Sequence, residues 1–287
     1  MKTSDIQVRF LWSAGRVPGL TACAGLGMVD TMIDAARRGL GRAAVMLICL
    51  GWLCLPALAG FKEEQNRYPR VRQARANVEE NLRTMFGHTG LAYPPREIFI
   101  RVFKLDSQLE LWARARLADP FRKVKTYRIC ASSGELGPKR REGDLQVPEG
   151  FYQVTVFNPW SQFHLSLQIN YPNRSDRILG DRYRPGGTIF IHGNCVTIGC
   201  IPIQDGPIEE VYIAAVDARS AGQARIPVHI FPTRMDESWK LLSDLATGKP
   251  GLLAFWQNLR EGYRLFNNLH SLPNFIIDLN GKYVFLF

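Results

Sequence analysis

Apolar and polar side chains alternate at every second position in several short stretches in the middle of the chain. A period of two places one set of side chains on each face of an extended strand. Asp106-Ser107 between the first two stretches is typical of a hairpin turn. The stretches expected to form strands are Ile98–Phe103, Leu109–Arg114, Val124–Cys130, Phe151–Phe157, His164–Tyr171, Ile189–Ile191 and Ile226–Phe231.

Helical periodicity lies mainly on the two sides of this region. Tyr68–Phe86 repeats apolar residues at three- and four-residue steps, which predicts an amphipathic packing helix. Asn280-Gly281 predicts a closing hairpin. Further helices are expected over Ile208–Arg219, Met235–Leu245 and Leu252–Leu269. The fold class is therefore α+β, mainly β with flanking helices.

An aromatic stripe marks the last of these helices. It consists of Trp256, Leu259, Tyr263 and Phe266 at helical spacing. Such a stripe is more often core than binding site, so we assign it to packing. Glu209 and Glu210 lie in the first turn of the expected Ile208–Arg219 helix, where the helix dipole accounts for them.

The residues with the most chemical potential lie within Thr188–Pro202. The apolar run Ile189–Ile191 ends on His192-Gly193, and seven residues separate His192 from Cys200. A cysteine is a nucleophile as its thiolate, and a nearby imidazole can take its proton. Glycine lets backbone N–H groups approach a developing oxyanion. We therefore predict acyl transfer through Cys200 with His192 as general base and acid, without a cofactor.

Other residues of this loop have supporting roles in the hypothesis. Gly193, Thr197 and Gly199 shape the loop and the oxyanion site. The group that orients His192 is either a backbone carbonyl or a hydroxyl such as that of Thr197. The histidines outside the loop, His164 and His229, are assigned structural roles because of their positions at strand edges.

Two alternatives apply to the same loop. His192, Cys195 and Cys200 could be three zinc ligands, but no paired Cys-x2–4-Cys motif and no convincing fourth ligand accompanies them. We therefore expect no metal. Cys200 could also be a small core residue, since free cysteines are often buried. The adjacent His-Gly pair argues for chemistry.

His192-Gly193 followed by Thr197-Ile198-Gly199-Cys200 resembles the His-Gly … Ser/Thr-x-Gly-Cys signature of YkuD-type L,D-transpeptidases. The resemblance is closest to the YafK-like branch of that family and extends from about Tyr68 to the C-terminus. The flanking blocks that carry it are Ser133–Lys139, Glu142–Asp144, Val147–Tyr152, Tyr171–Asn173, Ile208–Tyr212, Val228–Pro232 and Phe255–Leu259.

The resemblance implies a YkuD-like β-sandwich or barrel with a Cys200 nucleophile and a His192 acid/base. The implied substrates are diaminopimelate-containing peptidoglycan stem peptides. Many relatives have a longer insert between the two residues and Arg or Asn where this chain has Pro202, but the YafK-like branch shares both departures. Members of that branch are associated with hydrolysing the bond between diaminopimelate and a covalently attached lipoprotein.

The outcome of the reaction stays open at this point. Hydrolysis and transpeptidation share the first half-reaction, so the sequence does not distinguish them. A catalytically silent peptidoglycan-binding module of the same fold is the alternative to an enzyme.

Candidate substrate contacts come from polar segments before the motif. Lys139 or Arg140, in the loop Ser132–Glu149, could hold a stem carboxylate by a charge-assisted hydrogen bond. By resemblance, Tyr171 and Arg182 belong to the approach that lines the cleft. A solvated surface is the competing interpretation of these charges.

The N-terminal region has the features of a targeting segment. Arg37, Arg38 and Arg42 precede the apolar run Ala43–Leu55, and Ala57-Leu58-Ala59 has the small-x-small form of a cleavage site. This pattern predicts a secretory signal peptide at about residues 32–59. A membrane anchor is the alternative, but thirteen apolar residues fall short of the ~20 that a span needs. Residues 1–31 are interpreted as an over-extended start.

Export sets the expected compartment and partners. The predicted location is the periplasm, with membrane contact only through an uncleaved signal segment and no nucleic-acid partner. Thirty basic and twenty-three acidic residues follow residue 59, a net charge of +7. That charge suits an anionic envelope polymer, although a solvated charged surface explains it equally well.

Three cysteines remain after residue 59, namely Cys130, Cys195 and Cys200. An odd number in an oxidising compartment leaves at least one free thiol, and the nucleophile is the natural candidate. Cys195 could pair with Cys130 or with Cys200, and the second pairing would switch the enzyme off.

The expected organisation has four parts. They are a targeting region over 1–59, an N-terminal helix and linker over 60–95, a catalytic domain over 96–232, and a helix–hairpin extension packed on it over 233–287.

Overall fold

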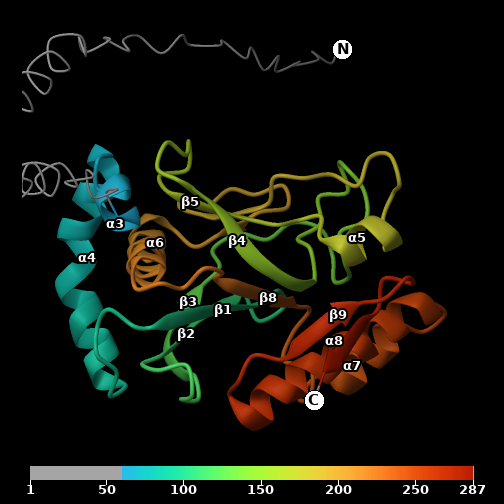
Figure 1. Cartoon of the computed structure of the whole chain (residues 1–287). Helices are drawn as coiled ribbons and strands as arrows, with labels where there is room; N and C mark the ends of the chain where they lie inside the picture. The colour runs from blue at the N-terminus through green and yellow to red at the C-terminus, as the bar shows by residue number, and fades with distance from the viewer. Residues whose placement is uncertain (1–59, 287) are drawn as a thin grey trace, which may run out of the picture. The chain divides into compact units, whose positions relative to one another are not determined.

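The computed structural model describes residues 60–286, so the targeting region expected over residues 1–59 lies outside the described residues. Within residues 60–286, the helices are too short or too polar to cross a membrane. Figure 1 shows the order of the helices and strands along the chain.

Eight strands form one sheet in the order β3-β2-β1-β8-β4-β5-β6-β7. The β1/β8 and β6/β7 pairs are parallel, and the other neighbours are antiparallel. The seven predicted strands are confirmed with small shifts at their ends, and the short β7 is an additional strand that the sequence reasoning did not predict. Their bounds are β1 (Glu97–Phe103), β2 (Gln108–Arg114), β3 (Arg122–Arg128), β4 (Gly150–Asn158), β5 (Ser166–Ile169), β6 (Phe190–His192), β7 (Ile201–Pro202) and β8 (Pro227–Phe231).

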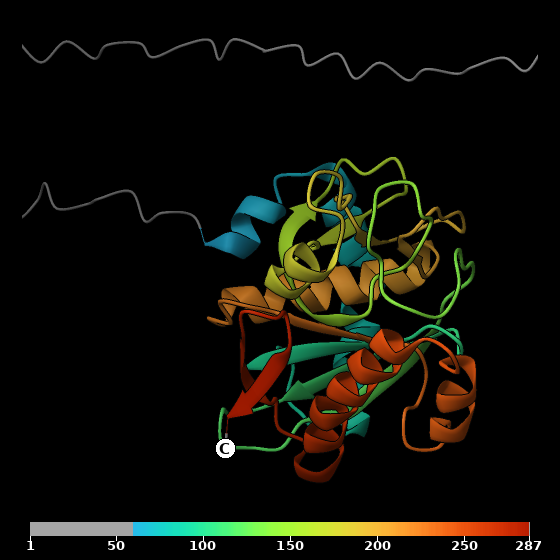
Figure 2. The same cartoon turned by 90° about the vertical axis from the view of Figure 1, so that its right-hand side faces the viewer.

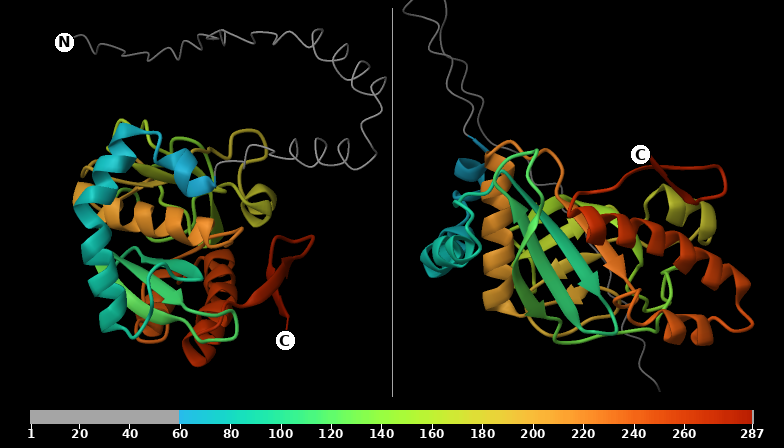
Figure 3. Two further views of the ribbon diagram at one scale, coloured as in Figure 1. Left: turned by 60° about the vertical axis from the view of Figure 1, so that its left-hand side comes forward. Right: turned by 90° about the horizontal axis from the view of Figure 1, so that it is seen from below.

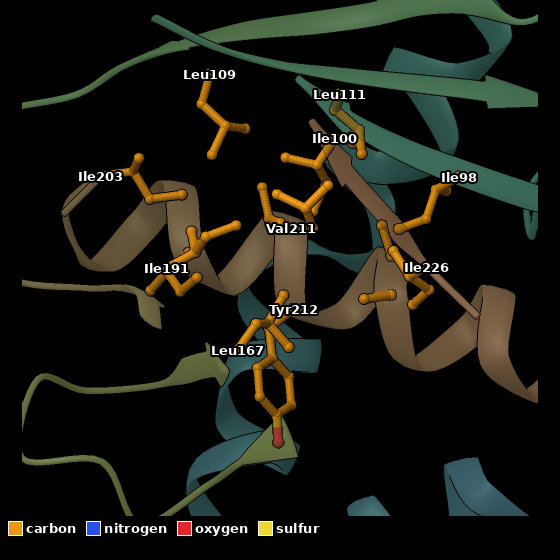
Figure 4. Close-up of a cluster of buried hydrophobic side chains, with 14 of the residues drawn as sticks. Ile98, Ile100, Leu109, Leu111, Leu167, Ile191, Ile203, Val211, Tyr212 and Ile226 are labelled. Carbon is orange, nitrogen blue, oxygen red and sulfur yellow. The ribbon is translucent and has the colours of Figure 1, made fainter. Parts of the chain in front are cut away.

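The sheet curls around one helix, α6 (Asp205–Ser220). In Figure 4, Leu109 from β2 and Ile191 from β6 lie around the same helix, beside its Val211 and Tyr212. These strands are far apart in the sheet order, so one core joins both halves of the sheet. Burial of side chains from both halves against α6 is the main apolar contribution to this fold.

Helix α6 begins three residues earlier than the sequence predicts. The sequence pattern predicts a start at Ile208, but Asp205 already starts the helix. Pro207 does not prevent this, because the first turn of a helix does not need the proline N–H. The short α3 (Phe61–Gln65) and the longer α4 (Pro69–His88) contact α6, as Figure 3 shows for α4.

Curling brings the two edges of the sheet together. Cys130, two residues beyond edge strand β3, donates its N–H to the carbonyl of Pro202 in edge strand β7 at 3.0 Å. A disulfide joins Cys130 to Cys195, with a Cα–Cα distance of 5.6 Å. The result is a half-barrel with flanking helices, which confirms the predicted fold class.

The C-terminal segment packs against the opposite face of the sheet (Figure 2). The four residues of the predicted aromatic stripe are all buried, and Trp256 and Tyr263 contact a cluster that includes Phe103, Phe151 and Phe231 from the sheet. This segment comprises α7 (Trp239–Leu245), α8 (Pro250–Leu269), β9 (Asn274–Ile277) and β10 (Tyr283–Leu286).

Two helices were missed by the sequence reasoning, the short α3 described above and α5. Helix α5 (Arg174–Leu179) lies in the approach to β6 and begins with a capping box. The Asn173 side chain accepts from the Asp176 N–H at 3.0 Å, and the Asp176 carboxylate accepts from the Asn173 N–H at 3.1 Å. An Asn-x-x-Asp signal was present in the sequence and could have located this helix.

Candidate active site

His192 ends one of two neighbouring parallel strands, and Cys200 stands immediately before the other. His192 is the last residue of β6 and pairs with Pro202 of β7, and Cys200 directly precedes β7. Cys200 therefore lies two residues before the β7 residue that pairs with His192. His192 is buried, whereas Cys200 is partly exposed with its Sγ 3.9 Å from the Thr188 carbonyl oxygen.

The imidazole is held in one orientation. Its Nδ1 lies 2.5 Å from the Gly193 carbonyl oxygen, which can only accept a hydrogen bond. The proton is therefore assigned to Nδ1, which leaves Nε2 as the free basic nitrogen. The Phe163 ring covers the imidazole at a centroid distance of 4.7 Å.

Burial keeps both groups neutral in the resting site. It lowers the pKa of His192, although the hydrogen bond to Gly193 acts in the opposite direction. Burial also raises the pKa of the Cys200 thiol, against smaller lowering effects from the Phe190 backbone and the Lys139 charge. In the resting state the two groups are thus a neutral imidazole and a neutral thiol, which is the starting state for general-base catalysis and not a thiolate–imidazolium ion pair.

Thr197 organises the loop between the two residues. Its hydroxyl accepts from the Gly199 N–H at 3.0 Å and donates to the Cys200 carbonyl at 2.8 Å. Of the two candidate orienting groups for His192, the backbone carbonyl of Gly193 is therefore the one in contact. The Gly199 N–H is already bonded in this state and is not a free oxyanion donor.

Both glycines of the motif occupy positions that exclude a side chain. Gly199 has φ +137°, and a Cβ there would lie 3.1 Å from the Gln146 carbonyl oxygen. A Cβ on Gly193 would lie 2.5 Å from Asp205 Oδ1 and 2.8 Å from the Phe163 carbonyl oxygen. The loop can pack this closely because glycine occupies these two positions.

The disulfide answers the pairing question raised by the three cysteines. Cys195 is bonded to Cys130, which leaves Cys200 as the free cysteine among residues 60–286. A cysteine in a disulfide cannot act as a zinc thiolate, so the zinc alternative loses one of its three ligands. Residues 60–286 also hold no cluster of three or more His, Cys, Asp or Glu side chains suited to a metal ion.

Three of the candidate substrate contacts differ in availability. The Lys139 ammonium is buried and held by the Arg141 carbonyl at 2.9 Å and by the Asp144 carboxylate. The Tyr171 hydroxyl donates to the Pro185 carbonyl at 2.8 Å. Arg182 is exposed, 5.8 Å from the Tyr183 ring centre. Lys139 and Tyr171 thus have their polar groups occupied within the protein, whereas Arg182 is exposed.

The rival histidines lie in other surroundings. His164 Nε2 is 2.7 Å from Glu209 Oε1 in an ion pair or hydrogen bond. His229 is buried between the rings of Phe99 and Phe151, and burial lowers its pKa well below the ordinary value. Both environments are those of structural residues.

Glu209 and Glu210 accept hydrogen bonds from distant side chains in addition to interacting with the helix dipole. Asn77 of α4 donates to Glu209 at 3.0 Å, and Glu210 accepts from Asn81 at 2.7 Å and from Tyr127 at 2.9 Å. These carboxylates are buried and connect α6 to α4 and β3. The dipole interpretation was incomplete because the partners lie far away in the sequence.

Comparison with known proteins gives a consistent result. The family model YkuD, described as the L,D-transpeptidase catalytic domain, matches residues 100–230, a range that contains His192 and Cys200. YafK of Escherichia coli K12, named as a candidate L,D-transpeptidase, is 33% identical over 189 residues, covering 65% of this chain and 73% of YafK. The YafK protein of strain O157:H7 matches to the same extent.

Among solved structures, the helical cell shape determining protein Pgp2 from Campylobacter jejuni is similar. It is 20% identical, with a TM-score of 0.38, and the match covers 63% of this chain and 73% of Pgp2.

Proposed function

Because the chain belongs to the YkuD family of L,D-transpeptidase catalytic domains, we propose that it is a cysteine enzyme that modifies peptidoglycan. The proposed substrates are stem peptides that contain diaminopimelate, and the proposed location is the periplasm. The observation that carries the proposal is the pairing of β6 with β7, which brings His192 opposite Pro202, two residues after the free thiol of Cys200.

The reaction begins when His192 Nε2 takes the proton from the Cys200 thiol. The sulfur attacks the carbonyl carbon of the scissile amide, and backbone N–H groups of the loop stabilise the oxyanion. Each such donor is worth ~3 kcal/mol of barrier. His192 then gives its proton to the leaving amine, and a thioester on Cys200 remains. The lowered pKa of His192 keeps it in the basic form before the reaction.

The acceptor decides the product. Water gives hydrolysis, including release of a lipoprotein bound to diaminopimelate, whereas the amine of a second stem gives L,D-transpeptidation. A catalytically silent wall-binding module of the same fold is the alternative, and the intact Cys200 and His192 pair favours the enzyme.

The test uses the protein from residue 60 onward on sacculi that carry covalently attached lipoprotein, with mass spectrometry of the released material. We expect lipoprotein whose terminal Lys lacks diaminopimelate for a hydrolase, and new cross-links or D-amino-acid exchange for a transpeptidase. Cys200→Ala should abolish either product. Identical silence of the wild type and this variant would favour the binding module.

A pair of histidine variants tests the choice of base. His192→Gln should remove activity, while His164→Gln should retain most of it, because His164 contacts Glu209 and not the nucleophile. Equal losses in both variants would contradict the assignment of His192.

A further inference from the structure

A buried ion pair gathers the loop that precedes β4. Lys104, one residue beyond β1, donates its ammonium to the carbonyl oxygens of Glu135, Gly137 and Val147 at 2.9–3.0 Å. The same ammonium lies 3.0 Å from the carboxylate of Glu149, which is fully buried. The Lys104 ammonium thus holds together the two ends of the segment 135–149.

Glu149 also connects this loop to the C-terminal segment. One carboxylate oxygen accepts from the Gly137 N–H at 2.7 Å, and the other accepts from Trp256 Nε1 at 2.7 Å. Trp256 belongs to α8 and is fully buried. Its indole N–H is therefore one of the donors that compensate a carboxylate removed from water.

Two other residues of this loop, Gln146 and Lys139, lie close to Gly199 and Cys200 of the candidate site. The Gln146 carbonyl packs against Gly199, so closely that a Cβ at Gly199 would lie 3.1 Å from it. Lys139 of the same loop holds its ammonium near the nucleophile, where the positive charge lowers the pKa of Cys200 against the effect of burial. Asp144 of the loop holds that ammonium in turn.

We propose that Trp256 is a positioning residue for Cys200, which acts through Glu149 on the loop that lies against Gly199 and carries Lys139. The inference rests on the proposed function only in taking Cys200 as the nucleophile. Through this contact the C-terminal segment takes part in catalysis.

The chain offers a matched control in Trp112. Its Nε1 donates to the buried carboxylate of Glu110 at 2.9 Å, and Glu110 is paired with Arg234 at 2.9 Å. This is the same chemistry as that of Trp256, but within residues 60–286 the Trp112 indole lies against Phe266, His270 and Arg101 and contacts no residue of the loop 132–149. Trp256→Phe and Trp112→Phe each remove one indole donor and keep an aromatic ring.

The measurement is the rate of alkylation of Cys200 by iodoacetamide against pH, in the protein from residue 60 onward with the disulfide intact. We expect Trp256→Phe to slow alkylation at neutral pH severalfold, because a higher thiol pKa leaves less thiolate, and to move the midpoint of the alkylation profile to higher pH. Trp112→Phe should leave the profile unchanged, although both variants lower the melting temperature.

Equal alkylation profiles for the two variants would overturn the proposal. If Trp256→Phe does not fold, the alkylation rate of Glu149→Gln is measured in its place, and we expect it to be lower than that of the wild type. Alkylation needs no substrate, so a protein that is silent on sacculi but shows the expected difference would refute the proposed function and leave the positioning role standing.

Discussion

Removing the Cys130–Cys195 disulfide should cost this fold a large part of its stability. The bridge closes a loop with a sequence separation of 65 residues. In the chain-entropy treatment, a loop of this length contributes about 4 kcal/mol at 25 °C, because the intact bridge restricts the unfolded chain. For a domain of this size, such a loss lowers the melting temperature by about 10 °C.

The perturbation is the double variant Cys130→Ala/Cys195→Ala, which removes the bridge without leaving an unpaired partner. Urea and thermal unfolding of the protein from residue 60 onward give the free energy of unfolding. Cys200→Ala is the matched control, because Cys200 forms no bridge and should change stability little. A loss below about 1 kcal/mol in the double variant would refute the entropic reasoning.

The same variant has a consequence for activity. Cys195 lies in the loop between His192 and Cys200, so loss of the bridge frees one end of that loop. We expect activity on sacculi to fall at temperatures where the variant is still folded. Full activity in the folded double variant would show that Thr197 and the glycines hold the loop unaided.

Three further predictions concern other parts of the molecule. Asp217→Asn breaks the buried bidentate pair with Arg75 and should cost about 3–5 kcal/mol at pH 7 in urea unfolding. Burial alone would raise the pKa of Asp217, but the hydrogen bonds from Arg75 and Tyr93 outweigh burial and lower it. The stability from this pair is therefore present above the unfolded-state pKa of Asp217 and is lost as the pH falls through its folded-state pKa. A loss of stability in Asp217→Asn that does not depend on pH would contradict the pairing. Gly262→Ala should destabilise the fold by about 1–3 kcal/mol, because the added Cβ would lie 2.6 Å from the rings of Phe151 and Phe285. The control is Gly251→Ala, whose Cβ would have no atom within 4 Å, so thermal melts should show unchanged or higher stability. The lowered pKa of His192 places the acid limb of kcat/KM below pH 6.5, and a limb above that value would argue against His192 as the base.

Local patterns in the sequence predicted the elements of the fold. Alternation located the strands, and the spacing of Trp256, Leu259, Tyr263 and Phe266 identified the buried face of α8. The His-Gly and Thr-x-Gly-Cys blocks located the candidate site because both lie in one short loop. Each of these signals depends on residues close together in the chain.

Interactions between distant residues were not predictable in the same way. Nothing near Glu149 in the sequence indicates that its partners are Lys104 and Trp256, which lie 45 and 107 residues away. Likewise, the ammonium of Lys139 was expected to be available for substrate, but its own loop folds back and holds it. Pairing of buried polar groups depends on the tertiary fold, which a single sequence does not display.

The closed edges of the sheet also bear on self-association. An open edge strand offers unpaired N–H and C=O groups to another chain and is a common starting point for aggregation. Here β7 has only two residues, one of them Pro202, whose carbonyl already accepts from Cys130. The other edge, β3, carries Arg122, Lys123 and Lys125, charges that oppose pairing with a second copy. The fold therefore limits edge-to-edge aggregation at both ends of the sheet, an advantage for any chain that must fold at high local concentration.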